Sequence, residues 1–225
     1  MAERTQITAV DGFTLGAWQG VPTGAPKGAV VVIQEIFGVN GHIREVVDGY
    51  AADGYFAIAP QIFDRVERDV ELGYAGEDMQ RGIALAFQQL DHASTLLDLQ
   101  ATIERASIHG RVGVVGYCFG GLLTWRSACE LSGVSAASAY YGGGIAGETQ
   151  RQPRCPVMMH FGDRDAHIPL SDVDKVKVAH PEVQVFVYAA DHGFNCNHRG
   201  SYDATAAALA KSRTLDFFAP HLARA

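Results

Sequence analysis

The stretch Val112-Gly113-Val114-Val115-Gly116-Tyr117-Cys118-Phe119-Gly120-Gly121 decides the fold of this chain. Its first half is a short apolar run that predicts a buried strand, and residues Phe119–Leu131 predict a helix. Between them, Cys118 is framed by Gly116 and Gly120 in the Gly-x-nucleophile-x-Gly pattern of a sharp strand-to-helix turn. Such a turn leaves no room for side chains at the two glycines, and the helix N-terminus favours negative charge on the sulfur. The pattern therefore indicates a nucleophilic cysteine rather than one more buried thiol.

Strand-like and helix-like stretches alternate on both sides of this turn. Asp11-Gly12 is a tight-turn signal between two strand-like runs, so we expect an antiparallel hairpin at the N-terminal edge. The alternation favours a mostly parallel sheet of about eight strands with helices on both faces, in a single α/β domain over residues 1–225. The expected strands are Thr5–Val10, Thr14–Gln19, Lys27–Gln34, Tyr55–Ala59, Arg111–Val115, Ala136–Tyr141, Val157–Phe161 and Val183–Val187. The other expected helices are 40–52, Met79–Leu90, Ala93–Arg105, Leu170–Ala179 and Ala204–Phe218, and residues 64–77 show no clear period.

Composition narrows the class of protein. Of the 225 residues, 48% are hydrophobic, which is enough for a sizeable core, and 19% are charged, which is too few for a disordered chain. The net charge of −7 argues against a nucleic-acid partner, because such proteins normally present a basic face. No apolar run reaches the roughly 18 residues that a membrane span needs. We therefore expect a protein that binds a small molecule, with no nucleic-acid or membrane partner, and a monomer.

Cysteine usage and the N-terminus point to a reducing compartment. MAERTQITAVDG lacks the apolar core and cleavage site of a secretory signal, so a cytoplasmic location with reduced thiols is expected. The other cysteines, Cys129, Cys155 and Cys196, show no pair or spacing typical of a zinc site or a redox motif. We expect them to be packing residues, and we expect no metal or organic cofactor.

Two later loops offer partners for Cys118. In enzymes with this turn the orienting acid and then the base follow the nucleophile along the chain. The segment Gly162-Asp163-Arg164-Asp165-Ala166-His167 follows a predicted strand, and either aspartate could be the acid or a simple turn residue. His192, after the last strand and before the last helix, is placed to be the base.

Four motifs together resemble the dienelactone hydrolase (carboxymethylenebutenolidase) family of the α/β-hydrolase superfamily. They are Gln34-Glu35-Ile36-Phe37-Gly38, Gly-Tyr-Cys-Phe-Gly-Gly at 116–121, Gly-Asp-Arg-Asp-Ala-His-Ile-Pro at 162–169 and Asp-His-Gly-Phe at 191–194. The similarity extends to Thr214-Leu215-Asp216-Phe217-Phe218, so it covers nearly the whole chain. It implies an α/β-hydrolase fold and a triad of Cys118, Asp165 and His192, which favours Asp165 over Asp163.

The resemblance also implies roles for residues near the triad. Glu35 matches a glutamate that contacts the resting thiol and helps to convert it to thiolate; otherwise it would be taken for a salt-bridged surface group. The backbone N–H groups of Ile36 and Phe119 match an oxyanion hole. Phe37 belongs to the same motif as Glu35, and a substrate contact is expected of it. Tyr140 and Tyr141 match a tyrosine pair that lines the family's pocket, although both could be packing residues.

The carboxylate-binding positions depart from the family. Arg81 matches one of two arginines that hold a substrate carboxylate, although a lone arginine on a helix is often only a surface charge. The second arginine is replaced by Cys196, and Arg199, three residues later, is expected to reach the same space or to pair with Glu35. Leu85 and Gln88 stand where the family has aromatic residues. The substrate pocket is therefore expected to be altered, while the reaction chemistry is retained.

The predicted reaction is hydrolysis of a lactone or an activated small ester, which could carry a carboxylate. Thiolate Cys118 attacks the carbonyl, a thioester forms, and water activated by His192 cleaves it. A broader carboxylesterase with the same triad is the first alternative. A binding module that has lost catalysis is the second, since fold does not fix function. A redox cysteine enzyme is disfavoured because no resolving cysteine lies nearby in the sequence.

Overall fold

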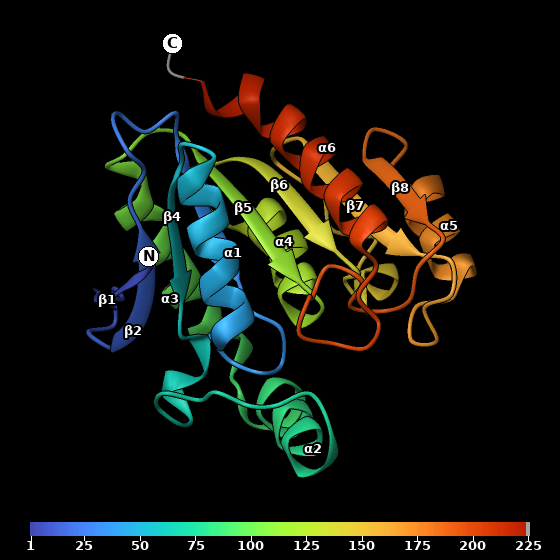
Figure 1. The fold of residues 1–225 in the computed structure, drawn as a ribbon, viewed down its shortest axis with the longest axis horizontal. Coiled ribbons are helices and arrows are strands. Elements are labelled where there is room, and N and C mark those ends of the chain that lie inside the picture. The colour runs from blue at the N-terminus through green and yellow to red at the C-terminus, as the bar shows by residue number, and fades with distance from the viewer. Residues whose placement is uncertain (224–225) are drawn as a thin grey trace.

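The computed structural model describes residues 1–223 and contains one eight-stranded sheet (Figure 1). The strand order is β1-β2-β4-β3-β5-β6-β7-β8. The pairs β1/β2 and β2/β4 are antiparallel, and all the others are parallel. The strands are β1 Glu3–Thr8, β2 Thr14–Gly20, β3 Ala29–Ile33, β4 Phe56–Pro60, β5 Val112–Tyr117, β6 Val134–Tyr140, β7 Val157–Gly162 and β8 Gln184–Tyr188. The predicted mixed sheet with an antiparallel N-terminal edge is confirmed.

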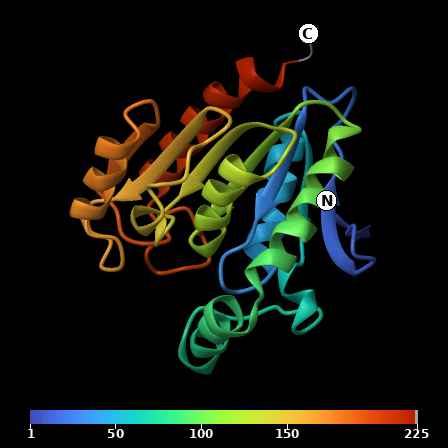
Figure 2. The same ribbon diagram turned by 180° about the vertical axis from the view of Figure 1, so that it is seen from behind.

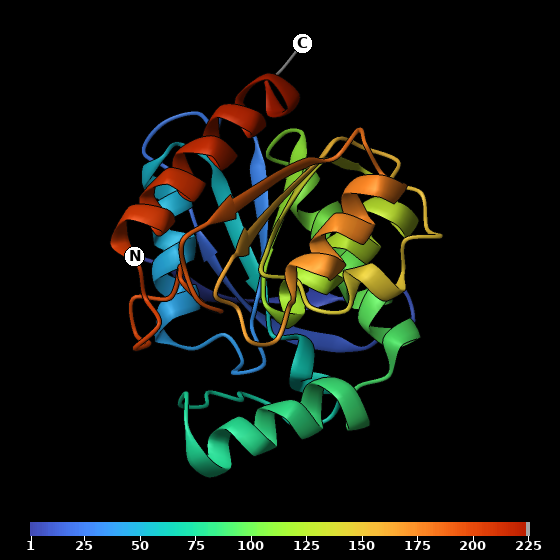
Figure 3. The same ribbon diagram turned by 90° about the vertical axis from the view of Figure 1, so that its right-hand side faces the viewer.

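Helices cover both faces of the sheet. Helices α1 and α6 lie on one face, and α3, α4 and α5 lie on the other (Figures 1 and 2). Helix α2 stands outside both layers, beyond one end of the sheet (Figure 3). The α-helices are α1 Gly41–Ala52, α2 Gly76–Ala84, α3 His92–Ser107, α4 Phe119–Glu130, α5 Leu170–Ala179 and α6 Ala204–Leu222. Shorter turns are the 3-10 helices η1 Ile62–Arg65 and η3 Ile145–Gly147 and the π-helix η2 Leu85–Gln89.

The uninterrupted apolar sequence of strand β3 follows from its burial on both faces of the sheet. Val30 and Val32 belong to one hydrophobic cluster, and Ala29, Val31 and Ile33 belong to the other. Alternate side chains of a strand point to opposite faces, so a strand covered on both faces needs apolar residues at every position. The parallel arrangement also brings the carboxyl ends of β3, β5, β7 and β8 to one edge, where the predicted site residues follow.

Most boundaries differ from the prediction by a few residues, and two of the differences are instructive. The first strand ends at Thr8 rather than at Val10, because Ala9 already belongs to the turn and accepts a hydrogen bond from Gly12 N–H at 2.9 Å. The helix predicted from Met79 begins three residues earlier, at Gly76, and its last turn is a π-helix. Within residues 1–223, no helix is long and apolar enough to cross a membrane.

Candidate active site

The nucleophile turn has the predicted geometry. Cys118 separates β5 from α4 and has φ 55° and ψ −115°, which is a strained conformation for a residue with a side chain. An added Cβ at Gly116 would lie less than 3.0 Å from the Gly120 carbonyl oxygen, and one at Gly120 would meet the Ile33 carbonyl oxygen equally closely. The glycines are thus required by close backbone approach. The turn leaves Cys118 only partly buried, at the N-terminus of α4.

The structure brings His192 to Asp165 and not to Asp163. His192 Nδ1 lies 2.7 Å from Asp165 Oδ2, and the Asp165 side chain is fully buried. The other oxygen, Oδ1, accepts hydrogen bonds from the backbone N–H groups of His167 at 2.8 Å and Ile168 at 3.1 Å. Asp163 is exposed and lies 3.7 Å from Arg164. The buried carboxylate is therefore fixed by three donors, and it in turn fixes the imidazole ring.

The surroundings of His192 favour its protonated form. Burial opposes a charge on the imidazole, but hydrogen bonds with Asp165 and Cys118 outweigh it and raise the pKa of His192 to about 10. The same interactions place His192 between the thiol and the carboxylate. The ring of Tyr141 packs 5.1 Å from the imidazole ring, centroid to centroid, and helps to hold it.

Glu35 is a buried carboxylate with a single partner. It follows β3, is 1% exposed, and its Oε1 lies 3.4 Å from Arg199 Nη1. Burial raises the pKa of Glu35, while the positive charges of Arg199 and His192 oppose that rise. The second oxygen, Oε2, has no hydrogen-bond partner among the described residues. Of the two expectations for Arg199, the structure shows the pairing with Glu35.

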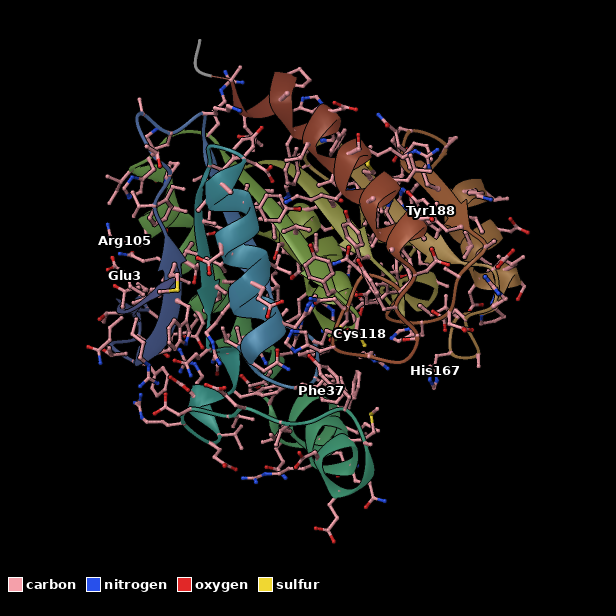
Figure 4. All side chains as sticks on the ribbon, viewed as in Figure 1. Glu3, Phe37, Arg105, Cys118, His167 and Tyr188 are labelled. Atoms are coloured by element: carbon pink, nitrogen blue, oxygen red, sulfur yellow. The ribbon has the colours of Figure 1, made fainter. Side chains whose placement is uncertain are left out.

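A cavity of about 400 Å³ opens beside Cys118. Figure 4 places Cys118, Phe37 and His167 at the same end of the sheet, close to α2. Most of the lining is apolar. It consists of Ile36, Phe37, Met79, Ile83, Phe87, Cys118, Phe119, Leu122, Gly143, Gly144, His167, His192 and Arg199. A cavity of this size, with a few polar groups converging on it, is typical of a small-molecule site.

Two residues that border this cavity have backbone N–H groups without a partner among the described residues. Ile36 follows Glu35, and Phe119 is the first residue of α4. Within residues 1–223, neither N–H donates a hydrogen bond to another protein group. Unpaired donors next to a nucleophile suit an oxygen that gains negative charge.

Three predicted substrate contacts lie elsewhere. Arg81 is half-exposed, pairs with Glu67 and does not border the cavity. It lies two positions after Met79, which turns it about 200° around α2 and away from the site. Tyr140 and Tyr141 are fully buried and also do not border the cavity; the Tyr140 hydroxyl lies 2.8 Å from Thr214 Oγ1. Both tyrosines pack inside the fold, and Tyr141 contacts the ring of His192, so a role for them in substrate binding stays a prediction.

Sequence reasoning missed seven of the lining residues, which are Met79, Ile83, Phe87, Leu122, Gly143, Gly144 and His167. Met79, Ile83 and Phe87 recur every four residues and so form one face of α2 and η2. That spacing was visible in the sequence, but an apolar stripe on a helix ordinarily predicts core rather than a pocket wall. His167, whose ring lies 5.2 Å from that of His192, and Leu122 carried no signal of their own.

The remaining cysteines are unreactive by environment. Burial raises the pKa of Cys129 and of Cys155 to about 12, and that of Cys196 to about 11. All four cysteines are free thiols. Within residues 1–223, no group of three or more His, Cys, Asp or Glu side chains is arranged to hold a metal ion.

Comparisons with known proteins agree with this fold. The model of the dienelactone hydrolase family matches residues 15–222. The chain is 39% identical to a putative carboxymethylenebutenolidase of Synechocystis sp. over 86% of each chain. It is 35% identical to a carboxymethylenebutenolidase of Pseudomonas putida, over 98% of this chain and 97% of the relative. A crystal structure of a putative dienelactone hydrolase from Klebsiella pneumoniae superposes with a TM-score of 0.82 at 28% identity, over 97% of this chain and 99% of that one.

The sheet topology and these neighbours define a hydrolase of the α/β-hydrolase fold. More narrowly, the chain belongs to the dienelactone hydrolase family and is a carboxylic ester hydrolase related to the carboxymethylenebutenolidases.

Proposed function

We propose that this protein hydrolyses a lactone or an activated small carboxylic ester through a thioester on Cys118. The observation that carries the proposal is the hydrogen-bonded pair of His192 and Asp165 beside the thiol. A buried carboxylate that orients an imidazole against a nucleophile is the arrangement that activates thiols and hydroxyls in acyl transfer. The names of the relatives, which are carboxymethylenebutenolidases, support a lactone as one substrate class.

The reaction would run in two steps. His192 takes the proton of the Cys118 thiol, the sulfur forms a bond to the carbonyl carbon, and the carbonyl electron pair moves onto oxygen. The carbon–oxygen bond of the ester or ring then breaks, and protonated His192 gives its proton to the departing oxygen. In the second step neutral His192 takes a proton from water, the hydroxide attacks the thioester, and the thiol is regenerated with a carboxylic acid as product.

Groups around the carbonyl would assist both steps. The N–H groups of Ile36 and Phe119 are free to donate to the oxyanion, and such donors often contribute a few kcal/mol in the transition state. Glu35 is proposed to assist deprotonation of Cys118. Its raised pKa and its unpaired oxygen support a role in moving a proton.

The test compares wild type, Cys118→Ala and, as a matched control, Cys129→Ala on dienelactone and on an aryl acetate. Hydrolysis is followed by ultraviolet absorbance and by nitrophenolate release. We expect wild type and Cys129→Ala to be equally active and Cys118→Ala to be slower by at least about 10³-fold. Equal activity of Cys118→Ala would refute the nucleophile. Inactivity of wild type on every lactone and ester would favour a binding module instead.

Thiol alkylation gives an independent measurement. Iodoacetamide followed by mass spectrometry should modify Cys118 first, because burial keeps the other three thiols protonated near neutral pH. Loss of activity should parallel modification of Cys118. Faster modification of any other cysteine contradicts the proposal.

A further inference from the structure

Five of the residues that border the cavity beside Cys118 have large apolar side chains. They are Met79, Ile83, Phe87, Phe119 and Leu122, which we call the apolar wall. The Phe87 ring contacts the Phe119 ring edge to face, with centroids 5.3 Å apart. Phe119 directly follows Cys118 in the chain, and both residues border the cavity.

Two residues of the apolar wall are exposed to solvent. Phe87 is 59% exposed and Ile83 is 41% exposed. Exposed apolar area next to a site is stabilised when a ligand covers it, because the ligand removes that area from water. The apolar wall therefore favours a hydrocarbon group.

The positive charge of Arg199 at the cavity is already neutralised by a protein carboxylate. Among the described residues that border it, Arg199 carries the only guanidinium group, and Arg199 is paired with buried Glu35. The guanidinium also lies over the rings of Phe37 and Tyr74, 5.6 and 5.8 Å from their centroids. Arg81, the other candidate for holding an anion, pairs with Glu67 outside the cavity. The imidazolium of His192 also borders the cavity and is paired with Asp165, so a substrate carboxylate would have to compete with Glu35 or Asp165 for a cation that already has a partner.

We infer that the preferred substrate is a neutral ester or lactone with a hydrocarbon substituent that packs on the apolar wall. This inference rests on the proposed function and specifies its substrate class. A cavity of about 400 Å³ holds such a substituent together with the reacting carbonyl. Specificity then comes from burial of hydrocarbon, with no contribution from an ion pair.

The first test uses p-nitrophenyl esters that differ only in the acyl group. The neutral series is acetate, butyrate and hexanoate, and the charged probe is the monoester of glutaric acid. We expect kcat/KM to rise about threefold per methylene along the neutral series, from the burial of each CH₂. The glutarate monoester should be at least about tenfold slower than butyrate. A flat neutral series, or a glutarate monoester as fast as butyrate, would overturn the inference.

The second test removes two side chains of the apolar wall. The double variant Ile83→Ala/Phe87→Ala should lower the ratio of kcat/KM for hexanoate to that for acetate by about fivefold or more. The matched control is Ile108→Ala, at the end of α3 and 70% exposed, which should leave the ratio unchanged. A damaged fold would lower both rates together, so an unchanged ratio in the double variant contradicts the inference.

Binding separates this inference from the proposed function. In Cys118→Ala protein, calorimetry should give a Kd for neutral 4-phenyl-2-butanone at least about tenfold lower than that for 4-oxopentanoate. This comparison needs no turnover, so it decides the substrate class even if the protein cleaves no ester and the proposed function fails. Tighter binding of the keto acid overturns the inference while leaving the Cys118 chemistry intact.

Discussion

At the scale of single residues, Asp165 shows what sequence can and cannot predict. The family motifs identified Cys118, His192 and Asp165, and the structure brings these three together. The same reasoning expected Arg81, Tyr140 and Tyr141 at the cavity, where they are not found. Motif residues are held by backbone turns that the sequence encodes locally. Pocket residues depend on helix rotation and on burial, which only the tertiary packing decides.

The carboxylate of Asp165 should be needed for its charge as well as for its shape. Asp165→Asn keeps the volume, but its amide is free to donate to His192 Nδ1 and so to favour the wrong tautomer. By analogy with the serine-protease triad, we expect kcat/KM to fall by about 10³-fold to 10⁴-fold with little change in melting temperature. Steady-state kinetics checks this, with exposed Asp163→Asn as the matched control that keeps full activity. Comparable losses in both variants would mean that Asp165 has no special role.

The raised pKa of His192 links stability to pH. The folded protein holds this proton up to about pH 10, whereas a free imidazole loses it near 6.5. The stabilisation from His192 is therefore fully present below about pH 6.5 and is lost as the pH rises towards 10. We expect the difference in the free energy of unfolding between wild type and His192→Gln to shrink across this window, as measured by urea denaturation at several pH values. A difference that grows with pH contradicts the assignment.

At the scale of elements, α2 packs directly against the segment after β3 that contains Ile36. An added Cβ at Gly82 would lie less than 3.0 Å from the Ile36 carbonyl oxygen. The sequence predicted this helix. Neither its contact with the segment that contains Ile36 nor the π-helix η2 could be inferred from helical periodicity. Both depend on how α2 packs against a segment more than 40 residues earlier in the chain.

Gly82→Ala should therefore disturb the site through the helix. The new methyl group pushes α2 away from Ile36, whose N–H is proposed to bind the oxyanion. We expect a loss of about 1–3 kcal/mol of stability and roughly a tenfold loss in kcat/KM. Thermal denaturation and kinetics measure both.

The matched control for Gly82→Ala is Gly49→Ala, in the middle of α1. An added Cβ at Gly49 meets nothing within 4 Å. This variant should keep full activity and gain about 0.5–1 kcal/mol. Full activity and unchanged stability in Gly82→Ala would show that α2 can move away from Ile36 without loss of free energy of unfolding or of activity.

At the scale of the whole molecule, Arg65 ties the N-terminal hairpin to the helix layer. Its guanidinium binds Asp98 of α3 at 2.7 Å and Asp11 of the hairpin turn at 2.8 Å, and it lies 4.4 Å from the centre of the Phe13 ring. The mostly parallel sheet followed from alternating strands and helices in the sequence. This link between residues 11, 65 and 98 did not, because no local pattern marks a long-range ion pair.

Replacing Arg65 should leave the buried carboxylate of Asp98 without its cationic partner. The Asp98 side chain has no exposed surface, so Arg65→Met leaves its carboxylate without a cation. We expect a loss of about 3 kcal/mol or more in the free energy of unfolding, measured by denaturant titration. Lys175→Met, which removes an exposed pair with Asp172, should cost less than about 1 kcal/mol. Equal effects would show that the Asp98 charge is solvated after all.

The placement of the apolar wall has an evolutionary consequence. Met79, Ile83 and Phe87 come from one continuous segment, residues 76–89, between β4 and α3. Cys118, Asp165 and His192 come from three other turns, after β5, β7 and β8. Substitutions within this short segment would thus alter the proposed substrate preference without touching the proposed catalytic groups. Grafting that segment between homologues is the direct way to move substrate preference from one to another.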